Sequence, residues 1–398
     1  MITALVFALQ VATPATPQDA NEAAGAMRPA VSQSISAITN DGDVLSAYLD
    51  VARVRANLGD VEINEAMFVD QSFANIAAIA GRDQDARDAF DYMFERLDRS
   101  TVPEAFDFTR SVEAMSVVID RAAEKRVVMI NEAHHLSLHR RFAEELARRL
   151  FESGYTALSL EALRSDFDGP ITRPLRHSDG FYTNDPAMAN IVRFYLDNGG
   201  IVLGHEASAQ ARQAGGGRSN LQAQAIEAHL EAYPDRKLLV LSGWGHVSEG
   251  GSQTAAQLRE ITGLDPLTID QTAPPPRGQS CGSQPMIYYD LHAEMVRVGA
   301  SAQADLVIRH GPPCLEGGSG RAWMSEYRRV DLEAPVSPPL LVQAHSPSDS
   351  AGAVAVDQRV ILQGEPVELS LRPGVYDVTY RSAGGRTHRE RIEIAADR

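Results

Sequence analysis

Several histidine and glutamate residues in this chain stand where apolar runs of the sequence come to an end. The residues concerned are Glu132, His134, Glu161, His205, Glu206 and His246. Imidazole has an ordinary pKa of about 6.5, so a histidine can take up or release a proton near neutral pH. A carboxylate beside it can hold one tautomer and raise its basicity. These residue types therefore indicate general acid–base chemistry.

The runs that carry these residues are short, continuous and rich in leucine and β-branched residues, as strands buried on both faces are. They span 125–134, 156–161, 201–206 and 238–246, and helical patterns separate them. This alternation predicts an α/β fold with a mostly parallel sheet flanked by helices. Because the carboxyl ends of parallel strands lie at one edge of a sheet, we expect the histidines and glutamates to meet in one cleft.

Four of the strand-end residues are predicted to be catalytic, namely Glu132, His134, Glu161 and His246. We expect His134 to act as a general base, oriented by Glu132 or by Glu161 from the neighbouring strand. A buried carboxylate without a partner is costly, so Glu161 needs one. The alternative partner for Glu161 is Arg164 or Arg173.

His246 closes the segment Gly243–His246, whose glycines permit a tight bend and the close approach of a ligand. We expect His246 to protonate a leaving group or to stabilise an oxyanion. The alternative is a histidine that caps the next helix. Since no serine or cysteine has the sequence context of a nucleophile, direct attack by water is favoured over an acyl-enzyme.

Other polar residues near the strand ends are predicted to bind the substrate or ligand, namely His205, Glu206, Arg218 and His135. A metal-assisted version of the site places Mn²⁺ or Zn²⁺ on His134, His246 and a glutamate. His135 and His139 stand four residues apart, as two metal ligands on one helix face would. We interpret that pair instead as an exposed helix start.

The charge of the chain argues against a nucleic-acid partner. The net charge is −16, whereas binding to a phosphate backbone needs a clustered basic surface. The pairs Arg140–Arg141 and Arg148–Arg149 are spaced like the solvated side of a helix. No stretch is long and apolar enough to span a membrane. We therefore expect a small-molecule or peptide substrate.

Residues 1–18 are interpreted as a possible signal peptide, because a short apolar block over 2–12 precedes a Thr- and Pro-containing segment. The charged start of such a peptide is missing, and the alternative is a disordered or helical N-terminus. A signal peptide would make the protein periplasmic or secreted. On that condition we expect Cys281 and Cys314 to form a structural disulfide, although in a cytosolic protein both could equally be free thiols.

The remaining chain divides into three regions that differ in sequence pattern. Residues 19–110 have helical spacing and predict a helical region that packs on the main domain and forms one wall of its cleft. Residues 111–330 predict the α/β domain, in which Asn220 caps a helix over 221–233. Residues 335–398 alternate short β-type runs with glycine and proline turns, which predicts a small antiparallel β module.

The motifs at the strand ends resemble those of the erythromycin esterase/ChaN-like/Tiki superfamily. Its members place Gly-Glu-x-His at one strand end, a glutamate at the end of the next strand and Gly-x-Gly-His later. Here Asn131-Glu-Ala-His134, Leu160-Glu161 and Gly243-Trp-Gly-His246 match in that order, within about 111–309. The helix start at 217–224 also resembles an Arg-rich helix start of the group. The departure is Asn131 in place of glycine, which weakens the inference of a close backbone approach there.

The superfamily includes water-activating hydrolases, metal-dependent proteases and a haem-binding protein. The resemblance therefore implies a hydrolase that acts on an ester, lactone or amide, with or without a metal. The alternative that it implies is a haem- or metal-binding uptake protein that uses the same cleft without catalysis. Because one fold hosts many functions, the resemblance supports the cleft better than it supports a reaction.

Overall fold

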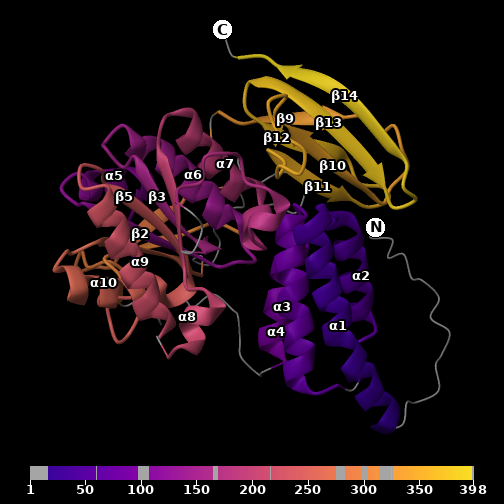
Figure 1. The fold of residues 1–398 in the computed structure, drawn as a ribbon, viewed down its shortest axis with the longest axis horizontal. Coiled ribbons are helices and arrows are strands. Elements are labelled where there is room, and N and C mark those ends of the chain that lie inside the picture. The colour runs from indigo at the N-terminus through magenta and orange to yellow at the C-terminus, as the bar shows by residue number, and fades with distance from the viewer. Residues whose placement is uncertain are drawn as a thin grey trace.

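The structure is a computed structural model that describes residues 17–59, 61–96, 107–164, 169–215, 217–274, 283–297, 303–312, 324 and 326–396. Within these residues the chain forms a helical region, an α/β region and a C-terminal β module, which pack side by side (Figure 1). Cys281 and Cys314 lie outside the described residues, as does nearly all of the expected signal peptide. Both interpretations stay predictions.

The helical region is a bundle that runs from the start of the described chain to residue 95. Its helices are α1 (Pro17–Asp41), α2 (Val44–Ala56), α3 (Ile63–Ile79) and α4 (Asp83–Glu95). Asp43 begins α2, because its side chain accepts a hydrogen bond from the backbone N–H of Ser46 at 3.3 Å. Val51, Ile76 and other apolar residues at helical spacing form one buried cluster between the helices.

The α/β region contains one eight-stranded sheet. Its strands are β1 (Arg110–Glu113), β2 (Val127–Glu132), β3 (Ala157–Arg164), β4 (Ile201–Glu206), β5 (Leu238–Gly243), β6 (Leu267–Ala273), β7 (Met286–Tyr289) and β8 (Leu306–Arg309). Their order in the sheet is β1-β7-β8-β6-β2-β5-β3-β4. Only β7 pairs antiparallel with its neighbours among the described strands of this sheet, and the other pairings are parallel.

Helices cover both faces of this sheet. They are α5 (Ala114–Ala122), α6 (Ser137–Phe151), α7 (Pro186–Asp197), α8 (Ala209–Gln213), α9 (Arg218–Ala232) and α10 (Thr254–Thr262), with 3₁₀ turns η1 (His177–Asp179), η2 (Tyr182–Asn184) and η3 (Trp244–Val247). Val128 and Ile130 of β2 pack in the cluster formed with α5, α6 and α7. Val127 and Met129 pack on the opposite face with α9 and α10. Burial on both faces explains the continuous apolar runs of these strands.

The β module consists of two small antiparallel sheets with a shared apolar core. Its strands are β9 (Arg328–Leu332), β10 (Leu340–His345), β11 (Asp357–Ile361), β12 (Val367–Leu371), β13 (Gly374–Ser382) and β14 (Thr387–Ile394). Strands β11-β10-β13-β14 form one sheet and β12-β9 form the other. The module also joins the helical region, since the N–H of Val360 donates to the carbonyl oxygen of Ala80 at 2.9 Å.

The predicted fold class is confirmed: a mostly parallel sheet is flanked by helices, and separate antiparallel sheets follow. The predicted start of α9 is wrong. The helix begins at Arg218 after Gly217, whose backbone is extended with ψ 134°, so Asn220 lies inside the first turn. No helix among the described residues has the length and apolar character needed to cross a membrane.

Candidate active site

His134 and Glu132 form a hydrogen-bonded pair just beyond β2. The Nδ1 atom of His134 lies 2.8 Å from Oε1 of Glu132. Burial alone would raise the pKa of Glu132, but the charge of Arg140 and the bond to His134 outweigh it and lower that pKa to about 2. The carboxylate is therefore ionised near neutral pH, and Nδ1–H of His134 donates to it. In the tautomer with its hydrogen on Nδ1, Nε2 carries a lone pair, and it makes no hydrogen bond with the described residues.

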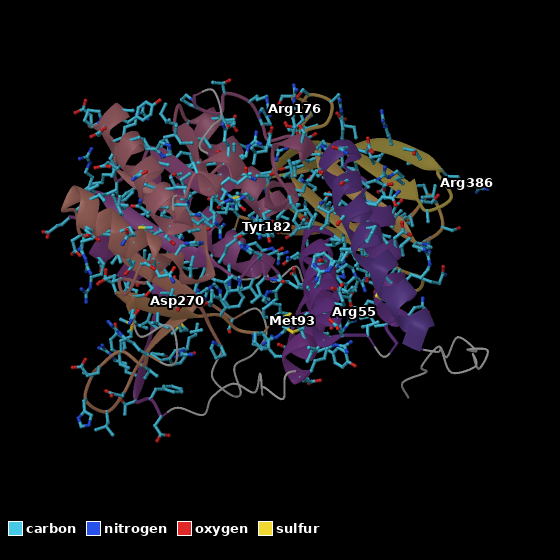
Figure 2. All side chains as sticks on the ribbon, turned by 60° about the horizontal axis from the view of Figure 1, so that its bottom comes forward. Arg55, Met93, Arg176, Tyr182, Asp270 and Arg386 are labelled. Atoms are coloured by element: carbon cyan, nitrogen blue, oxygen red, sulfur yellow. The ribbon has the colours of Figure 1, made fainter. Side chains whose placement is uncertain are left out.

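The ring of His134 is held between an aromatic face and a glycine. It stacks on Tyr182 of η2 with ring centroids 4.0 Å apart and an interplanar angle of 19°, and Figure 2 shows Tyr182 in the middle of the molecule. On the other side, a Cβ at Gly243 would lie 2.8 Å from Nε2 of His134. Only glycine leaves room for the ring there. The side chain of His134 still remains 19% exposed.

The buried guanidinium of Arg140 balances the charge of Glu132 at the end of β2. It binds both carboxylate oxygens of Glu132, and it donates to Asp185 Oδ2 at 2.9 Å and to the carbonyl oxygen of His134 at 3.0 Å. The interpretation of Arg140 and Arg141 as solvated residues is wrong, because both are buried. The start of α7 covers Arg140, since Asp185 also caps that helix.

Arg141 is buried for a related reason. Its guanidinium binds Asp83 at the start of α4 at 2.6 Å, so the helical region covers this side of α6. The hydroxyl of Ser137, the first residue of α6, donates to Asp185 Oδ2 at 2.5 Å and lies 3.3 Å from the carbonyl oxygen of Ala78 in α3. The part of α6 at Arg140 and Arg141, which the sequence predicts to be solvated, is therefore an interface between two regions of the chain, whereas Arg149 is exposed.

Glu161 binds the end of β5 and does not orient His134. Its Oε2 accepts the backbone N–H of Gly243 at 2.5 Å, and its Oε1 accepts Nη2 of Arg218 at 2.5 Å. The expectation that Glu161 and His134 come from neighbouring strands is wrong, because β5 lies between β2 and β3. Glu161 and the ring of His134 instead both lie against Gly243, since a Cβ there would be 2.8 Å from Nε2 of His134 and 3.5 Å from Oε2 of Glu161.

Arg218 links two glutamates at the carboxyl edge of the sheet. In addition to Glu161, it binds Glu206 at the end of β4, with Nη2 2.6 Å from Oε2 of Glu206. The side chain of Arg218 is 45% exposed. Its Nη1 group makes no hydrogen bond within the described part of the chain, so it can donate to a bound molecule. The predicted ligand-binding residues Arg218 and Glu206 therefore lie together beside Glu161.

A series of hydrogen bonds places the ring hydrogen of His246 on Nδ1. Nε2 of Gln222 donates to Glu206 at 2.9 Å. Oε1 of Gln222 therefore accepts the hydroxyl hydrogen of Thr254, at an oxygen–oxygen distance of 2.7 Å. The oxygen of Thr254 then accepts Nδ1–H of His246 at 2.9 Å. Nε2 of the neutral ring is left as an acceptor, 3.6 Å from Oε1 of Glu161.

This arrangement does not supply the proton that we expected from His246. Burial lowers the pKa of His246, although the charge of Glu161 raises it in part. The ring is therefore neutral near pH 7, and its Nε2 carries no hydrogen for a leaving group or an oxyanion. The bond to Thr254, the first residue of α10, agrees in part with the alternative of a histidine at the start of a helix.

His205 does not lie at the surface with the other strand-end residues. It is fully buried within the sheet region, where Nδ1 lies 2.9 Å from Ser159 Oγ and Nε2 lies 3.1 Å from Ser242 Oγ. Burial holds the pKa of His205 well below its usual range. Both ring nitrogens have protein partners, so His205 supports the strands and has no nitrogen free for a ligand.

His135 and His139 do not form an exposed helix start, and that interpretation is wrong. His135 is 4% exposed because Phe90 of α4 stacks on it with ring centroids 3.6 Å apart. Burial lowers the pKa of His135 to about 3. His139 is also buried, and its Nδ1 accepts the backbone N–H of Ala133 at 3.0 Å. Neither residue presents a free ring to a ligand.

Aromatic residues from two regions lie beside the turn that carries His246. Phe90 of α4 lies over Trp244 of η3 with ring centroids 5.7 Å apart, and Trp244 is 40% exposed. Asn131 holds this turn, because its Nδ2 donates to the carbonyl oxygen of Trp244 at 2.6 Å and to Asp270 Oδ1 at 2.8 Å. The asparagine that departs from the family pattern thus positions the turn that carries His246.

The donors around His134 and His246 do not form a metal site. Among the described residues, no three histidine, cysteine, aspartate or glutamate side chains are grouped so that they could hold a metal ion. The nearest carboxylates, Glu132 and Glu161, are bound to arginines. The metal assignment to His134 and His246 gains no support from this arrangement.

The chain matches no family model. No curated protein matches it either. Among solved structures it is similar to "The structure of the type III effector HopBA1", with 17% identity over 53% of this chain and 100% of that one, and a TM-score of 0.33. It is also similar to a structure described as "Bacterial protein toxins", with 16% identity, 57% and 55% coverage and a TM-score of 0.29. Such values carry no functional inference, and the superfamily resemblance stays a prediction.

Proposed function

We propose that this protein is a hydrolase that uses His134 to activate water against an ester, lactone or amide. The observation that supports the proposal is the state of His134. Its Nδ1 is bonded to the ionised Glu132, and its Nε2 has no partner among the described residues. A carboxylate–histidine pair with one free ring nitrogen is the arrangement that a general base requires.

In the proposed reaction, a water molecule donates a hydrogen bond to Nε2 of His134. As the water oxygen attacks the carbonyl carbon, its proton passes to Nε2, and the carboxylate of Glu132 stabilises the imidazolium that forms. When the tetrahedral intermediate collapses, the carbon–oxygen or carbon–nitrogen bond breaks and the same proton passes to the leaving group. His134 is then neutral again. A positioned base contributes about 10²- to 10⁴-fold to the rate.

Arg218 is the proposed donor to the oxyanion. Its Nη1 group is free among the described residues, and its guanidinium sits beside Glu161, whose other oxygen anchors Gly243 next to His134. A fixed cation near the developing negative charge lowers the barrier without reorganisation. In this scheme the acceptor atom Nε2 of His246 binds an N–H or O–H group of the substrate.

The experiment compares wild type, His134→Ala and His388→Ala on p-nitrophenyl acetate, γ-butyrolactone and a p-nitroanilide. His388 is exposed on β14 and serves as the matched histidine control. We expect hydrolysis of at least one probe by wild type and His388→Ala, and its loss in His134→Ala. The fold should survive, because Glu132 keeps Arg140 as a partner.

Two results would contradict the proposal. One is full turnover by His134→Ala. The other is an absence of turnover in all proteins together with a haem Soret band that is lost in His134→Ala, which would favour the uptake function. Export to the periplasm or the medium belongs to the proposal as a prediction from residues 1–18, and detection of the mature protein outside the cytoplasm tests it.

A further inference from the structure

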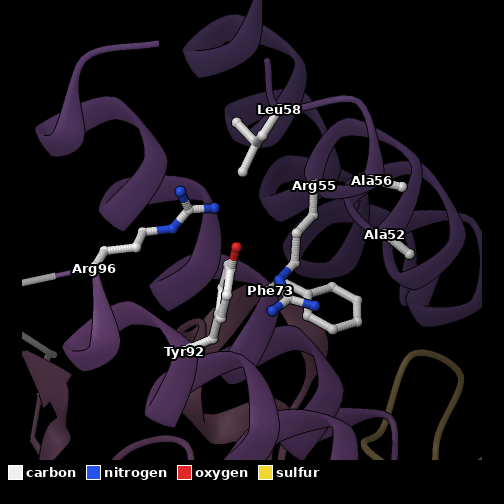
Figure 3. A pocket seen from close by; sticks show the side chains of 7 residues that line it. All are labelled: Ala52, Arg55, Ala56, Leu58, Phe73, Tyr92 and Arg96. Atoms are coloured by element: carbon white, nitrogen blue, oxygen red, sulfur yellow. The ribbon is translucent and has the colours of Figure 1, made fainter. Parts of the chain in front are cut away.

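A cavity lies in the helical region, between α2, α3 and α4. Its volume is about 400 Å³, which is within the range of small-molecule sites. Arg55, Arg96 and Tyr92 line it together with Phe73, Leu58 and two alanines (Figure 3). These residues take no part in the proposed hydrolysis, so an inference about this cavity does not depend on that function.

The cavity holds an excess of positive charge. Nε of Arg55 donates to Asp70 Oδ1 at 2.7 Å, and Nε of Arg96 donates to Asp70 Oδ2 at 2.8 Å. Asp70 is completely buried, so one carboxylate serves two guanidinium groups. Burial of a single carboxylate requires only one cation as a partner. The second arginine therefore leaves one net positive charge among these three side chains.

Both arginines keep donors available for a bound anion. Each uses only Nε on Asp70, and the Nη groups make no hydrogen bond with residues that the structure describes. The side chains are 28% exposed for Arg55 and 25% exposed for Arg96. A guanidinium presents its Nη groups in a planar fork that fits carboxylate and phosphate oxygens.

Aromatic rings provide the remaining surface of the cavity. The ring of Tyr92 stands between the two guanidinium groups (Figure 3), with the Cζ atom of Arg96 4.5 Å and that of Arg55 5.5 Å from its centroid. Arg55 also lies 5.4 Å from the ring centroid of Phe73. Stacking on rings holds the guanidinium planes in place and leaves an apolar wall for the body of a ligand.

We propose that this cavity binds a small organic anion, in which a carboxylate or phosphate group is attached to an apolar or aromatic body. The oxyanion accepts hydrogen bonds from the Nη groups of Arg55 and Arg96. The body lies against Phe73, Tyr92 and Leu58. Both the charge and the shape of the ligand therefore determine how tightly it binds.

The test is a calorimetric titration of the full chain with phenyl phosphate, benzoate, inorganic phosphate and benzyl alcohol. We expect saturable binding of phenyl phosphate or benzoate, and the stronger of the two identifies the anionic group. Inorganic phosphate lacks the body and benzyl alcohol lacks the charge, so both should bind at least about tenfold more weakly. If inorganic phosphate bound as tightly as phenyl phosphate, the inference that the ligand has an apolar body would be overturned.

Variants separate the proposed site from general electrostatic attraction. Arg96→Gln should weaken binding about 10- to 100-fold, and the fold should persist because Asp70 keeps Arg55. Arg55→Lys keeps the charge but loses the fork, and it should also weaken binding. The control is Arg53→Gln, which alters an arginine of α2 that is 71% exposed and paired with Asp50. Equal affinities in wild type, Arg96→Gln and Arg53→Gln, or no saturable binding of either organic anion, would overturn the proposal.

Discussion

Arg140 binds two buried carboxylates inside the protein. It joins Glu132, which orients His134, to Asp185, which caps α7. At the scale of single residues, the orientation of His134 therefore depends on a cation, Arg140, that is completely buried. The charge of Arg140 determines the protonation of Glu132, and that carboxylate in turn determines which nitrogen of His134 is free.

We predict that Arg140→Gln lowers the free energy of unfolding by about 3–5 kcal/mol, because it leaves Glu132 and Asp185 buried without their cation. Arg149→Gln on the same helix is the control. Arg149 is 54% exposed and pairs with Glu145, so its loss should cost less than about 1 kcal/mol. Urea unfolding of the three proteins measures both changes. Similar small changes in the two variants would show that the buried network is not stabilising.

The sequence predicted the strand-end residues better than their partners. Glu132, His134, Glu161 and His246 all lie around the ends of β2, β3 and β5, since an apolar run that ends on a polar residue marks the edge of a parallel sheet. Tyr182 was missed because it comes from a turn whose position depends on packing. Arg140 was missed because helical spacing cannot tell a solvent-exposed face from one covered by another region.

The turn from β5 into η3 is the element that brings the site together. Its backbone N–H at Gly243 binds Glu161, the carbonyl oxygen of Trp244 accepts from Asn131, and its last turn carries His246. Trp244 has a φ of +22°, an uncommon value for a bulky residue. Contacts from β2 and β3 therefore hold this turn in one geometry.

We predict that Gly243→Ala reduces kcat by about 10²-fold while the protein stays folded. The φ of −82° at this position suits alanine, but its Cβ would lie 2.6 Å from Cε1 of His134 and displace the ring. Gly245→Ala is the matched control, because its nearest neighbours are Gln253 atoms at 3.8 Å. Steady-state kinetics on the substrate found for wild type measures the effect. Equal rates for the two variants would mean that His134 need not occupy its observed position.

At the scale of the whole molecule, the three regions meet at a junction near His135. Phe90 of the helical region stacks on His135 of the α/β region, and the β module is bonded to Ala80 just before α4. Figure 1 shows the helical region below the β module and beside the α/β region. The sequence predicted the fold class, whereas this junction depends on contacts between distant segments and could not be deduced from local patterns.

Burial of neutral histidines makes the stability of the whole molecule depend on pH. The four that are buried in the α/β region are His135, His139, His205 and His310. Burial lowers the pKa of His135 and His310 to about 3, and it holds those of His139 and His205 well below the usual range. The unfolded chain binds protons on these groups near pH 6.5, but the folded chain does not.

We predict that the thermal midpoint falls steeply as the pH decreases from 7.5 to 5. Each depressed histidine contributes stability that is fully present above about pH 6.5 and is lost as the pH falls towards the folded pKa, by up to about 1.4 kcal/mol per pH unit. Thermal melts in buffers of constant ionic strength measure the change. A midpoint that is constant or rises over this range would contradict the burial of neutral histidines.

The central claim is that the free Nε2 of His134 removes a proton from water. Its most direct test is the hydrolysis rate of His134→Ala with and without imidazole, on the probe that wild type cleaves. We predict a loss of about 10²- to 10⁴-fold that added imidazole partly and saturably restores, because the ring can bind between Tyr182 and Gly243 beside Glu132. A rate equal to that of wild type without imidazole would contradict the claim.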